Sequence, residues 1–274
     1  MEESPTCIGS TSTVARLRPG VFLKSPIETG HKAVAEKVKL AFAIEPPILQ
    51  RLGSHPRIVR YLGQNDRGLL LSEASHGNLQ AYINTNNTSI DLSQRKKWCH
   101  QTAEAVAYIH GRGVIHSDLR PENILLHQTT SGSLDLMLCD FGGAVCDELE
   151  LDGGQLPNDP FYDPTQGVEI TPSVDLFGLG SLFYTILTGF WPYRTRVLFG
   201  EEGDDSYLDY VDKVNLLFSQ GQYPEVAGLV GGEVIMGCWT RKYSTAQQVL
   251  DDLRKRMPID DATRELHEGR LKGE

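Results

Sequence analysis

Long apolar stretches are missing from this sequence. No run of 18 apolar residues occurs, and residues 1–5 are acidic and polar, whereas a secretory signal needs a basic start and an apolar stretch. These absences argue against a membrane span and against export. We therefore expect an intracellular protein, cytoplasmic with the nucleus left open, that has no membrane partner.

Basic charge and paired cysteines are also scarce. Lysine and arginine number 26 against 36 aspartates and glutamates, which gives a net charge of −10 and a surface poorly suited to nucleic acid or anionic lipid. Basic protein partners are easier to accommodate, and a monomer is expected. The five cysteines are odd in number and scattered, which argues against a zinc site or a disulfide framework and favours reduced thiols.

One stretch carries most of the functional information. The residues from His116 to Asn123 read His-Ser-Asp-Leu-Arg-Pro-Glu-Asn, and Asp140-Phe141-Gly142 begins 17 residues after Asn123. An aspartate and an asparagine five positions apart on one loop, with a second aspartate beyond the next hairpin, can hold a hydroxyl group and two magnesium ions around one phosphate. The spacing therefore predicts phosphoryl transfer.

This loop resembles the catalytic loop of the eukaryotic protein kinases, and Asp140-Phe141-Gly142 is identical to their metal-binding motif. The resemblance covers roughly residues 8–256, and the chain is similar to short fungal proteins that consist of a kinase domain alone, so no appended regulatory domain is expected. The implied fold is bilobal and α+β, with a small β-rich lobe and a larger, mostly helical lobe. The expected divisions are a β-rich lobe over residues 1–75, a helical lobe over 76–257 and a charged tail over 258–274.

The resemblance implies roles for the side chains of the transfer site. Asp118 would orient the acceptor hydroxyl and receive its proton, and Arg120 would offset the charge on the moving phosphoryl group. Asn123 and Asp140 would bind magnesium. His116 is expected to be structural, packing against the phenylalanine of the metal-binding motif.

The first 75 residues have the pattern of a β-rich lobe. Apolar runs at residues 14–17 and 21–24 flank Arg18-Pro19-Gly20, which is a turn signal, so we expect a hairpin. Lys24 ends the second run. The resemblance implies that this lysine binds the α- and β-phosphates of ATP and pairs with a glutamate of the helix that follows.

Two glutamates are candidates for this pairing. Glu45 lies at the expected distance along the chain, but Pro46 and Pro47 lack amide hydrogens and disfavour helical geometry in the residue before them. The helical pattern over residues 32–44 is therefore expected to break at this point. Glu36, inside that pattern, is the alternative partner.

The implied nucleotide pocket departs from the family pattern at two places. Only Gly9 remains of the glycine-rich phosphate loop, and Phe22 stands where the family has a small alanine over adenine, so the adenine slot would be narrowed. Ser72 would be the gatekeeper at the start of the hinge. The implied nucleotide-binding residues are Gly9, Val14, Phe22, Lys24, Glu45, Glu73, Ser75 and Leu125.

The segment after the metal-binding motif lacks the usual sites of phosphorylation. Between Gly142 and Asp163 there is no serine or threonine, and Tyr162 is the only phosphorylatable residue. Ser117 stands where many kinases have an arginine that binds a phosphate on this segment, so control by such a phosphate is not expected. Acidic side chains supply negative charge instead, either as a plain solvated loop or in favour of basic substrates: Asp147, Glu148, Glu150, Asp152 and Asp159.

Beyond this segment the family pattern is partly kept. Asp163-Pro164-Thr165 replaces the usual Ala-Pro-Glu, which leaves open whether Arg241 has the partner that this glutamate would provide. Asp175 resembles the aspartate that caps backbone amides of the catalytic loop. Residues 196–211 resemble a mobile surface insertion.

Three functions are compatible with these observations. The favoured one is a serine/threonine protein kinase that uses ATP and Mg²⁺. The eroded glycine loop and Phe22 favour instead a pseudokinase that acts as a binding scaffold. A small-molecule phosphotransferase of the aminoglycoside or choline kinase type shares the His-x-Asp-x4-Asn pattern, but Asp140-Phe141-Gly142 and the stretch around Asp175 favour a protein kinase.

Overall fold

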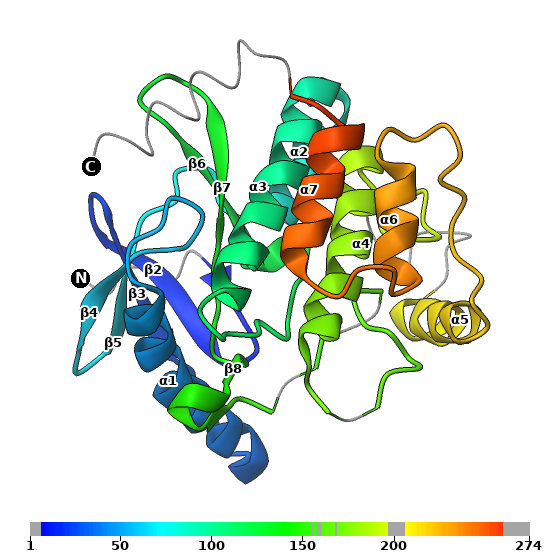
Figure 1. Ribbon diagram of the computed structural model, residues 1–274. Helices are drawn as coiled ribbons and strands as arrows, with labels where there is room; N and C mark the ends of the chain where they lie inside the picture. Colours follow the sequence, from blue (N-terminus) through cyan, green and yellow to red (C-terminus); the bar gives the residue numbers. More distant parts are fainter. Residues whose placement is uncertain (1–6, 155, 158–159, 168, 197–205, 260–274) are drawn as a thin grey trace.

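The computed structural model describes residues 7–154, 156–157, 160–167, 169–196 and 206–259, so most of the expected charged tail, as well as Asp159, lies outside the described residues. Two parts are evident in Figure 1, a sheet lobe and a larger helical lobe. Within the described residues, no helix is long and apolar enough to cross a membrane. The side chains of four cysteines are described, and all four are free thiols: Cys99, Cys139, Cys146 and Cys238.

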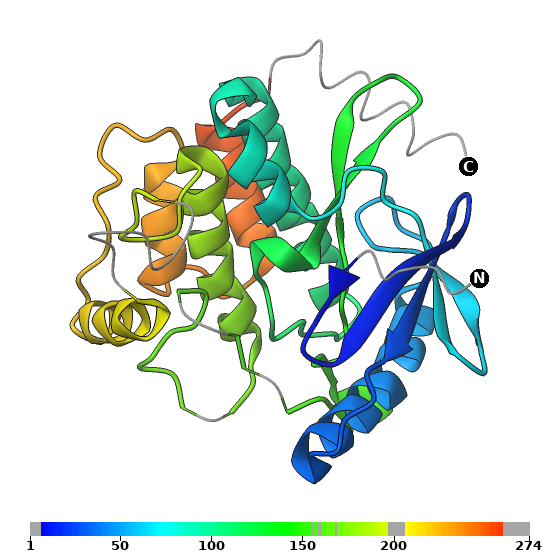
Figure 2. The ribbon, with the colours of Figure 1, turned by 180° about the vertical axis from the view of Figure 1, so that it is seen from behind.

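The sheet lobe contains five antiparallel strands and one long helix. The order across the sheet is β1-β2-β3-β5-β4. Helix α1 lies against this sheet on the side that faces the helical lobe (Figures 1 and 2). The elements are β1 (Cys7–Ile8), β2 (Ser12–Arg18), β3 (Val21–Pro26), α1 (Lys32–Leu52), β4 (Tyr61–Asn65) and β5 (Gly68–Ser72).

The hairpin expected around Arg18-Pro19-Gly20 is confirmed. Strands β2 and β3 pair with Val14 opposite Lys24, and Gly20 at the turn has a φ of 82°, a left-handed conformation that suits glycine. Along β3, Val21 and Leu23 are buried on one face. Since side chains alternate along a strand, Phe22 and Lys24 share the opposite face.

The expectation that the helix breaks before the two prolines is wrong. Helix α1 continues through Pro46 and Pro47 to Leu52. A proline within a helix removes one hydrogen bond and costs about 3 kcal/mol. Burial of the apolar face of the same turns offsets that cost, because Ile48 and Leu52 are fully buried and Pro46 is buried with them.

The helical lobe is built around a buried central helix, α4. Gly180 allows a close approach to α6, because a Cβ there would lie 2.9 Å from a ring carbon of Trp239. Helix α3 contacts both α4 and α7. The helices are α2 (Leu79–Asn86), α3 (Leu92–His110), α4 (Pro172–Thr188), α5 (Tyr207–Ser219), α6 (Gly232–Trp239) and α7 (Ala246–Arg256).

Two short strand pairs lie between α3 and α4 and carry the loops of interest. The pairs are β6 (Ile124–Gln128) with β7 (Leu134–Leu138), and β8 (Val145–Cys146) with β9 (Leu151–Asp152). The surface insertion expected over residues 196–211 is only partly described, since 197–205 lie outside the described residues. Its last residues are helical, because α5 begins at Tyr207 with the Ser206 hydroxyl accepting from the Asp209 amide, so that part of the expectation is wrong.

Candidate active site between the two lobes

A buried lysine joins the two lobes. Lys24 on β3 lies with its Nζ 2.5 Å from Oε2 of Glu45 on α1 and 2.7 Å from Oδ1 of Asp140, which follows β7. Glu45 Oε1 also accepts a hydrogen bond from the Phe141 amide at 3.2 Å. The alternative partner, Glu36, lies 3.9 Å from Lys32 on the exposed face of α1. The structure therefore pairs Lys24 with Glu45.

The charges of this cluster support one another. Burial alone would lower the pKa of Lys24, but the carboxylates of Asp140 and Glu45 outweigh it and raise that pKa, so the lysine stays charged. Burial would raise the pKa of Asp140, yet the adjacent Lys24 lowers it below the usual range for aspartate. For Glu45 burial prevails and raises the pKa despite the lysine. Only Asp140 offers this cluster a solvent-facing carboxylate, since 41% of its side chain is exposed.

Asp118 and Asn123 are also brought together. A short 3₁₀ helix, Pro121–Asn123, turns the chain so that Asn123 Nδ2 donates to the Asp118 carbonyl at 2.9 Å and to its Oδ2 at 3.0 Å. These bonds fix the amide of Asn123 with its nitrogen toward Asp118. The side-chain oxygen Oδ1 of Asn123 is thereby directed away from Asp118 and can act as a ligand of a cation.

Burial determines the protonation behaviour of Asp118. It raises the pKa of this carboxyl, against the opposing effects of Arg120 and His116. A raised pKa makes the carboxylate a stronger base. Arg120 lies 3.1 Å from Glu122, and although burial opposes it, the charges of Glu122 and Asp118 raise the pKa of this guanidinium.

Asp175 of α4 binds the backbone of the loop that contains His116, Ser117 and Asp118. Its carboxylate accepts from the amides of His116 at 2.8 Å and Ser117 at 2.9 Å, and from His110 Nε2 at 2.8 Å. Asp175 is fully buried, and these partners lower its pKa although burial opposes them. The expectation that Asp175 caps the amides of this loop is confirmed.

The residues flanking Asp118 pack as predicted. The His116 ring meets the Phe141 ring edge to face with centroids 4.9 Å apart, which confirms the expected contact. Ser117 has a φ of 59° and donates from its hydroxyl to the Gly143 carbonyl at 2.6 Å. The position where many kinases have an arginine is thus a buried side chain tied to the start of the following segment.

The implied nucleotide positions are placed as follows. Phe22 shares a face with Lys24 and pairs across the sheet with Leu71 rather than with Ser72. The Ser72 hydroxyl instead accepts from the Arg60 amide at 3.0 Å, so Leu71 is the residue opposite Phe22 and the gatekeeper assignment of Ser72 does not agree with this register. Leu125 lies on β6 on the strand face opposite the buried Ile124 and Leu126. Val14 is opposite Lys24 on β2, and Gly9 forms the exposed turn between β1 and β2.

The side chains of Glu73 and Ser75 make structural contacts. Glu73 accepts from the Gly20 amide at 2.7 Å and pairs with Arg16 at 3.0 Å, which ties the link after β5 to the tip of the β2–β3 hairpin. Ser75 accepts from the Gln128 amide at 2.8 Å.

Two arginines contact the segment from Gly142 to Asp163: the contact of Arg51 was not expected from the sequence, and that of Arg241 supplies the partner that the sequence left open. Arg51, in the last turn of α1, forms an ion pair with Glu148. Arg241 binds Asp163, with its Nε 2.8 Å from Oδ2, and donates to the Thr165 hydroxyl at 2.8 Å. The ion pair expected between Arg241 and a glutamate at position 165 is therefore formed by Asp163, two residues earlier.

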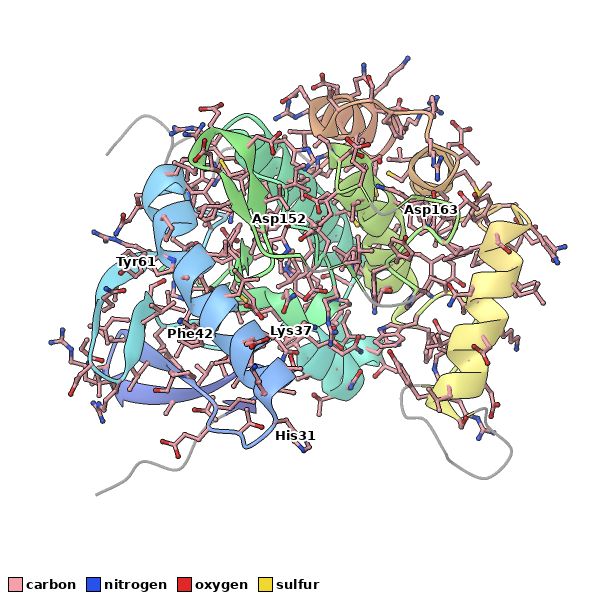
Figure 3. All side chains as sticks on the ribbon, turned by 90° about the horizontal axis from the view of Figure 1, so that it is seen from below. His31, Lys37, Phe42, Tyr61, Asp152 and Asp163 are labelled. Carbon is pink, nitrogen blue, oxygen red and sulfur yellow. The ribbon has the colours of Figure 1, made fainter. Side chains whose placement is uncertain are left out.

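These two contacts lie in different parts of the molecule. In Figure 3, α1 is marked by Lys37 and Phe42, Asp152 is labelled between this helix and the helical lobe, and Asp163 is labelled farther to the right, within the helical lobe. Among the described residues, no group of three or more acidic, histidine or cysteine side chains could hold a metal ion by itself.

Comparison with known proteins agrees with this geometry. The chain is 32% identical over 200 residues to the 3-phosphoinositide-dependent protein kinase 1 of Mus musculus, and 31% identical over 214 residues to the serine/threonine-protein kinase PkaA of Streptomyces coelicolor. The matches cover 68% and 70% of this chain but only 33% and 39% of those proteins. Residues 27–202 match the family model of the protein kinase domain, and the chain therefore belongs to the protein kinase family.

Proposed function

We propose that this protein transfers the terminal phosphoryl group of ATP, with Mg²⁺, to serine or threonine hydroxyls of a protein substrate. The observation that carries the proposal is the proximity of two clusters: Lys24 with Glu45 and Asp140, and Asp118 with Asn123. The Cys139 amide, next to Asp140, donates to the backbone carbonyl of Asn123 at 3.0 Å and so links them. The first suits phosphate and metal binding and the second suits delivery of a hydroxyl. The relatives named above are serine/threonine kinases, which supports this choice of acceptor.

The donor atoms at the site fit magnesium and a phosphate chain. Asp140 is ionised and part of its side chain faces solvent, and the carbonyl oxygen of Asn123 is directed away from Asp118. Both are hard oxygen ligands, which Mg²⁺ prefers together with phosphate oxygens. Lys24 remains charged and would bind the phosphates, so bound magnesium-ATP would present its terminal phosphoryl group near Asp118.

Asp118 is the proposed base for the transfer. Its raised pKa and its fixed position against Asn123 suit a carboxylate that orients a hydroxyl and takes its proton. Arg120 would stabilise negative charge that develops on the phosphoryl oxygens. Asp175 and His116 orient the backbone of this loop from beneath and touch no substrate.

The acceptor is proposed to lie in a basic stretch of protein. Three exposed acidic residues lie on or beside the short β8–β9 hairpin: Asp147, Glu150 and Asp152. Lysine or arginine near the acceptor hydroxyl would interact favourably with this surface and steer association. The net charge of −10 acts in the same direction.

A scaffold without turnover is the second candidate, favoured by Phe22. The phenyl ring lies on the same face of β3 as Lys24, where the family has a methyl group, and Gly9 is the sole glycine of the β1–β2 turn. Both features affect nucleotide binding and neither touches Asp118. The two candidates therefore differ in whether ATP binds and is consumed.

The test is a transfer assay with the whole chain. Purified protein, radiolabelled ATP and Mg²⁺ are incubated with histone or myelin basic protein, and labelled residues are identified after hydrolysis. We expect phosphoserine or phosphothreonine in the basic protein. Binding of ATP without label transfer would favour the scaffold, and label found only on an added aminoglycoside or choline would favour a small-molecule phosphotransferase.

A further inference from the structure

We propose that Arg51 and Glu148 are positioning residues, which hold α1 in place for the reaction without a phosphate on the segment after Gly142. This inference rests on the proposed kinase function. It concerns how that site is kept assembled, and neither residue is expected to touch substrate or nucleotide.

Three segments distant in sequence meet at Arg51. Its guanidinium donates from Nε to the Arg112 carbonyl at 2.6 Å and pairs through Nη2 with Oε2 of Glu148. Gly113 lies against both side chains, because a Cβ there would be 3.1 Å from Glu148 Oε1 and 3.6 Å from Arg51 Nη2. One guanidinium thus joins the end of α1, the turn after α3 and the 3₁₀ helix Asp147–Leu149.

The position of Arg51 on α1 connects this contact to the reaction. Glu45 lies six residues earlier on the same helix, about 9 Å along its axis at 1.5 Å per residue. The Glu45 carboxylate contacts both Lys24 and the Phe141 amide. Because the helix moves as a unit, holding its last turn limits the movement of Glu45 away from Lys24.

The position of Glu148 connects the same contact to the catalytic loop. Glu148 follows β8, where Val145 exchanges two backbone hydrogen bonds of 2.9 Å with Ile115. Ile115 directly precedes His116, whose amide is bound by Asp175. The Arg51–Glu148 pair therefore closes a loop of contacts that includes α1, the segment after Gly142 and the residues leading to Asp118.

A permanent carboxylate explains two departures from the kinase pattern. The segment from Gly143 to Tyr162 contains no serine or threonine, and the usual phosphate-binding arginine is replaced by Ser117, which is fully buried. Glu148 supplies a standing negative charge and Arg51 the cation that receives it. The charged contact that other kinases gain by phosphorylation is then built into this chain.

The exposure of the pair predicts which measurements will respond. The Arg51 side chain is 25% exposed and that of Glu148 is 66% exposed, so the pair contributes little to global stability. Its effect is expected in the placement of α1. Loss of the pair should therefore slow transfer and loosen the C-terminal half of α1 while leaving the unfolding temperature nearly unchanged.

The test is a double-mutant cycle with Glu148→Gln, Arg51→Gln and the double variant. Glu150→Gln is the matched control for the exchange experiment alone, because Glu150 lies in the same segment and loses the same charge, whereas its proposed contact with basic substrates excludes it as a control for transfer. Transfer rates are measured with the phosphatase-treated chain. Hydrogen exchange of residues 45–52 is measured without nucleotide, and this reports on α1 whether or not the protein proves to be a kinase.

We expect Glu148→Gln and Arg51→Gln each to lower the transfer rate about fivefold, with no further loss in the double variant. Hydrogen exchange in residues 45–52 should be faster in all three variants than in the wild type. Exchange of the same residues in Glu150→Gln should match that of the wild type. The proposal is overturned if Glu148→Gln behaves as Glu150→Gln does in exchange. It is also overturned if the two single losses add in full. A wild type without any transfer would contradict the proposed function alone, because the exchange experiment would still decide the role of the pair.

Discussion

The catalytic loop and the strands of the sheet lobe are built very differently. His116 and Ser117 are fixed through Asp175, a fully buried carboxylate with three hydrogen-bond donors around it. In the sheet lobe, strand β3 contacts Asp140 through the side chain of Lys24. The turn between β1 and β2, including Gly9, is exposed.

The difference indicates where the family pattern tolerated change. A buried network of charge-assisted hydrogen bonds is costly to alter in part, because each lost partner leaves another buried group unsatisfied. An exposed turn and one face of a strand carry no such penalty. Accordingly Phe22 and the missing glycines alter the nucleotide side, whereas the departures in the helical lobe, Ser117 and Thr165, leave Asp118, Asn123 and Asp140 in their expected places in the sequence.

The largest expected effect is on the catalytic loop. Asp118→Asn removes the carboxylate that takes the proton, so the transfer rate should fall at least about 100-fold. Nucleotide binding should stay within about twofold, because the ion pairs that hold Lys24 are made by Glu45 and Asp140, which this substitution leaves in place. Single-turnover transfer and calorimetric titration with magnesium-ATP measure the two quantities. A variant that kept full turnover would show that the base has been assigned to the wrong residue.

The joint between the lobes should contribute measurably to stability. Asp135 on β7 pairs with Arg57 at 2.8 Å and with Lys97 at 2.6 Å, and these partners hold its pKa at about 2 although burial opposes them. A pKa lowered from 3.8 to about 2 corresponds to about 2 kcal/mol. We expect Asp135→Asn to lower the free energy of unfolding by about that amount at pH 7.

The pH dependence of this effect has a definite sign. Because the folded state holds Asp135 ionised, its contribution is complete above the unfolded pKa of 3.8 and is lost as the pH falls toward 2. Urea unfolding of wild type and Asp135→Asn at pH 7 and at pH 3 should show a smaller difference at the lower pH. An equal difference at both would mean that the ion pairs do not stabilise this joint.

The nucleotide side should respond to a change at Phe22. Overfilling a formed pocket costs about 1–3 kcal/mol, so Phe22→Ala is expected to tighten magnesium-ATP binding about tenfold. Phe22→Leu keeps most of the bulk and serves as the control, with little change expected. Calorimetric titration of the three proteins compares them. Weaker binding by Phe22→Ala would mean that the ring packs against the nucleotide usefully.

The smallest expected effect concerns phosphorylation. Tyr162 is the one phosphorylatable residue between Gly142 and Asp163, and its hydroxyl already donates to the Gln166 carbonyl at 3.1 Å. Phosphatase treatment, or Tyr162→Phe, should change the transfer rate by less than about twofold. A large loss of activity after treatment would place control on a phosphate after all.

The contacts of the motif residues were predictable because each motif consists of residues that are close together in the sequence. The spacing of Asp118, Asn123 and Asp140 indicated phosphoryl transfer, and the resemblance to the protein kinases implied the individual roles of these residues and those of Lys24 and Asp175. The hairpin before Lys24 was predicted for a local reason too, since a turn signal lay between two apolar runs. Local patterns determined these expectations, and the structure agrees with the contacts among them.

The errors and omissions arise where distant residues decide the outcome. Local propensity predicted a helix end before Pro46, but burial of α1 keeps the helix continuous. Arg51 and Glu148 are 97 residues apart, and nothing in either neighbourhood indicates the partner. The sequence left open which residue pairs with Arg241, and the fold supplies Asp163 as the charged partner beside the Thr165 hydroxyl.

The most direct test of this account is single-turnover phosphoryl transfer by the phosphatase-treated wild-type chain at rising magnesium-ATP, with a basic protein as acceptor. Asp118→Asn is the reference for uncatalysed background. We predict a rate that saturates with ATP and exceeds the reference at least about 100-fold at saturation. A wild-type rate equal to that of Asp118→Asn at every concentration, with ATP bound, would contradict the claim that Asp118, Asn123 and Asp140 form a working site of phosphoryl transfer.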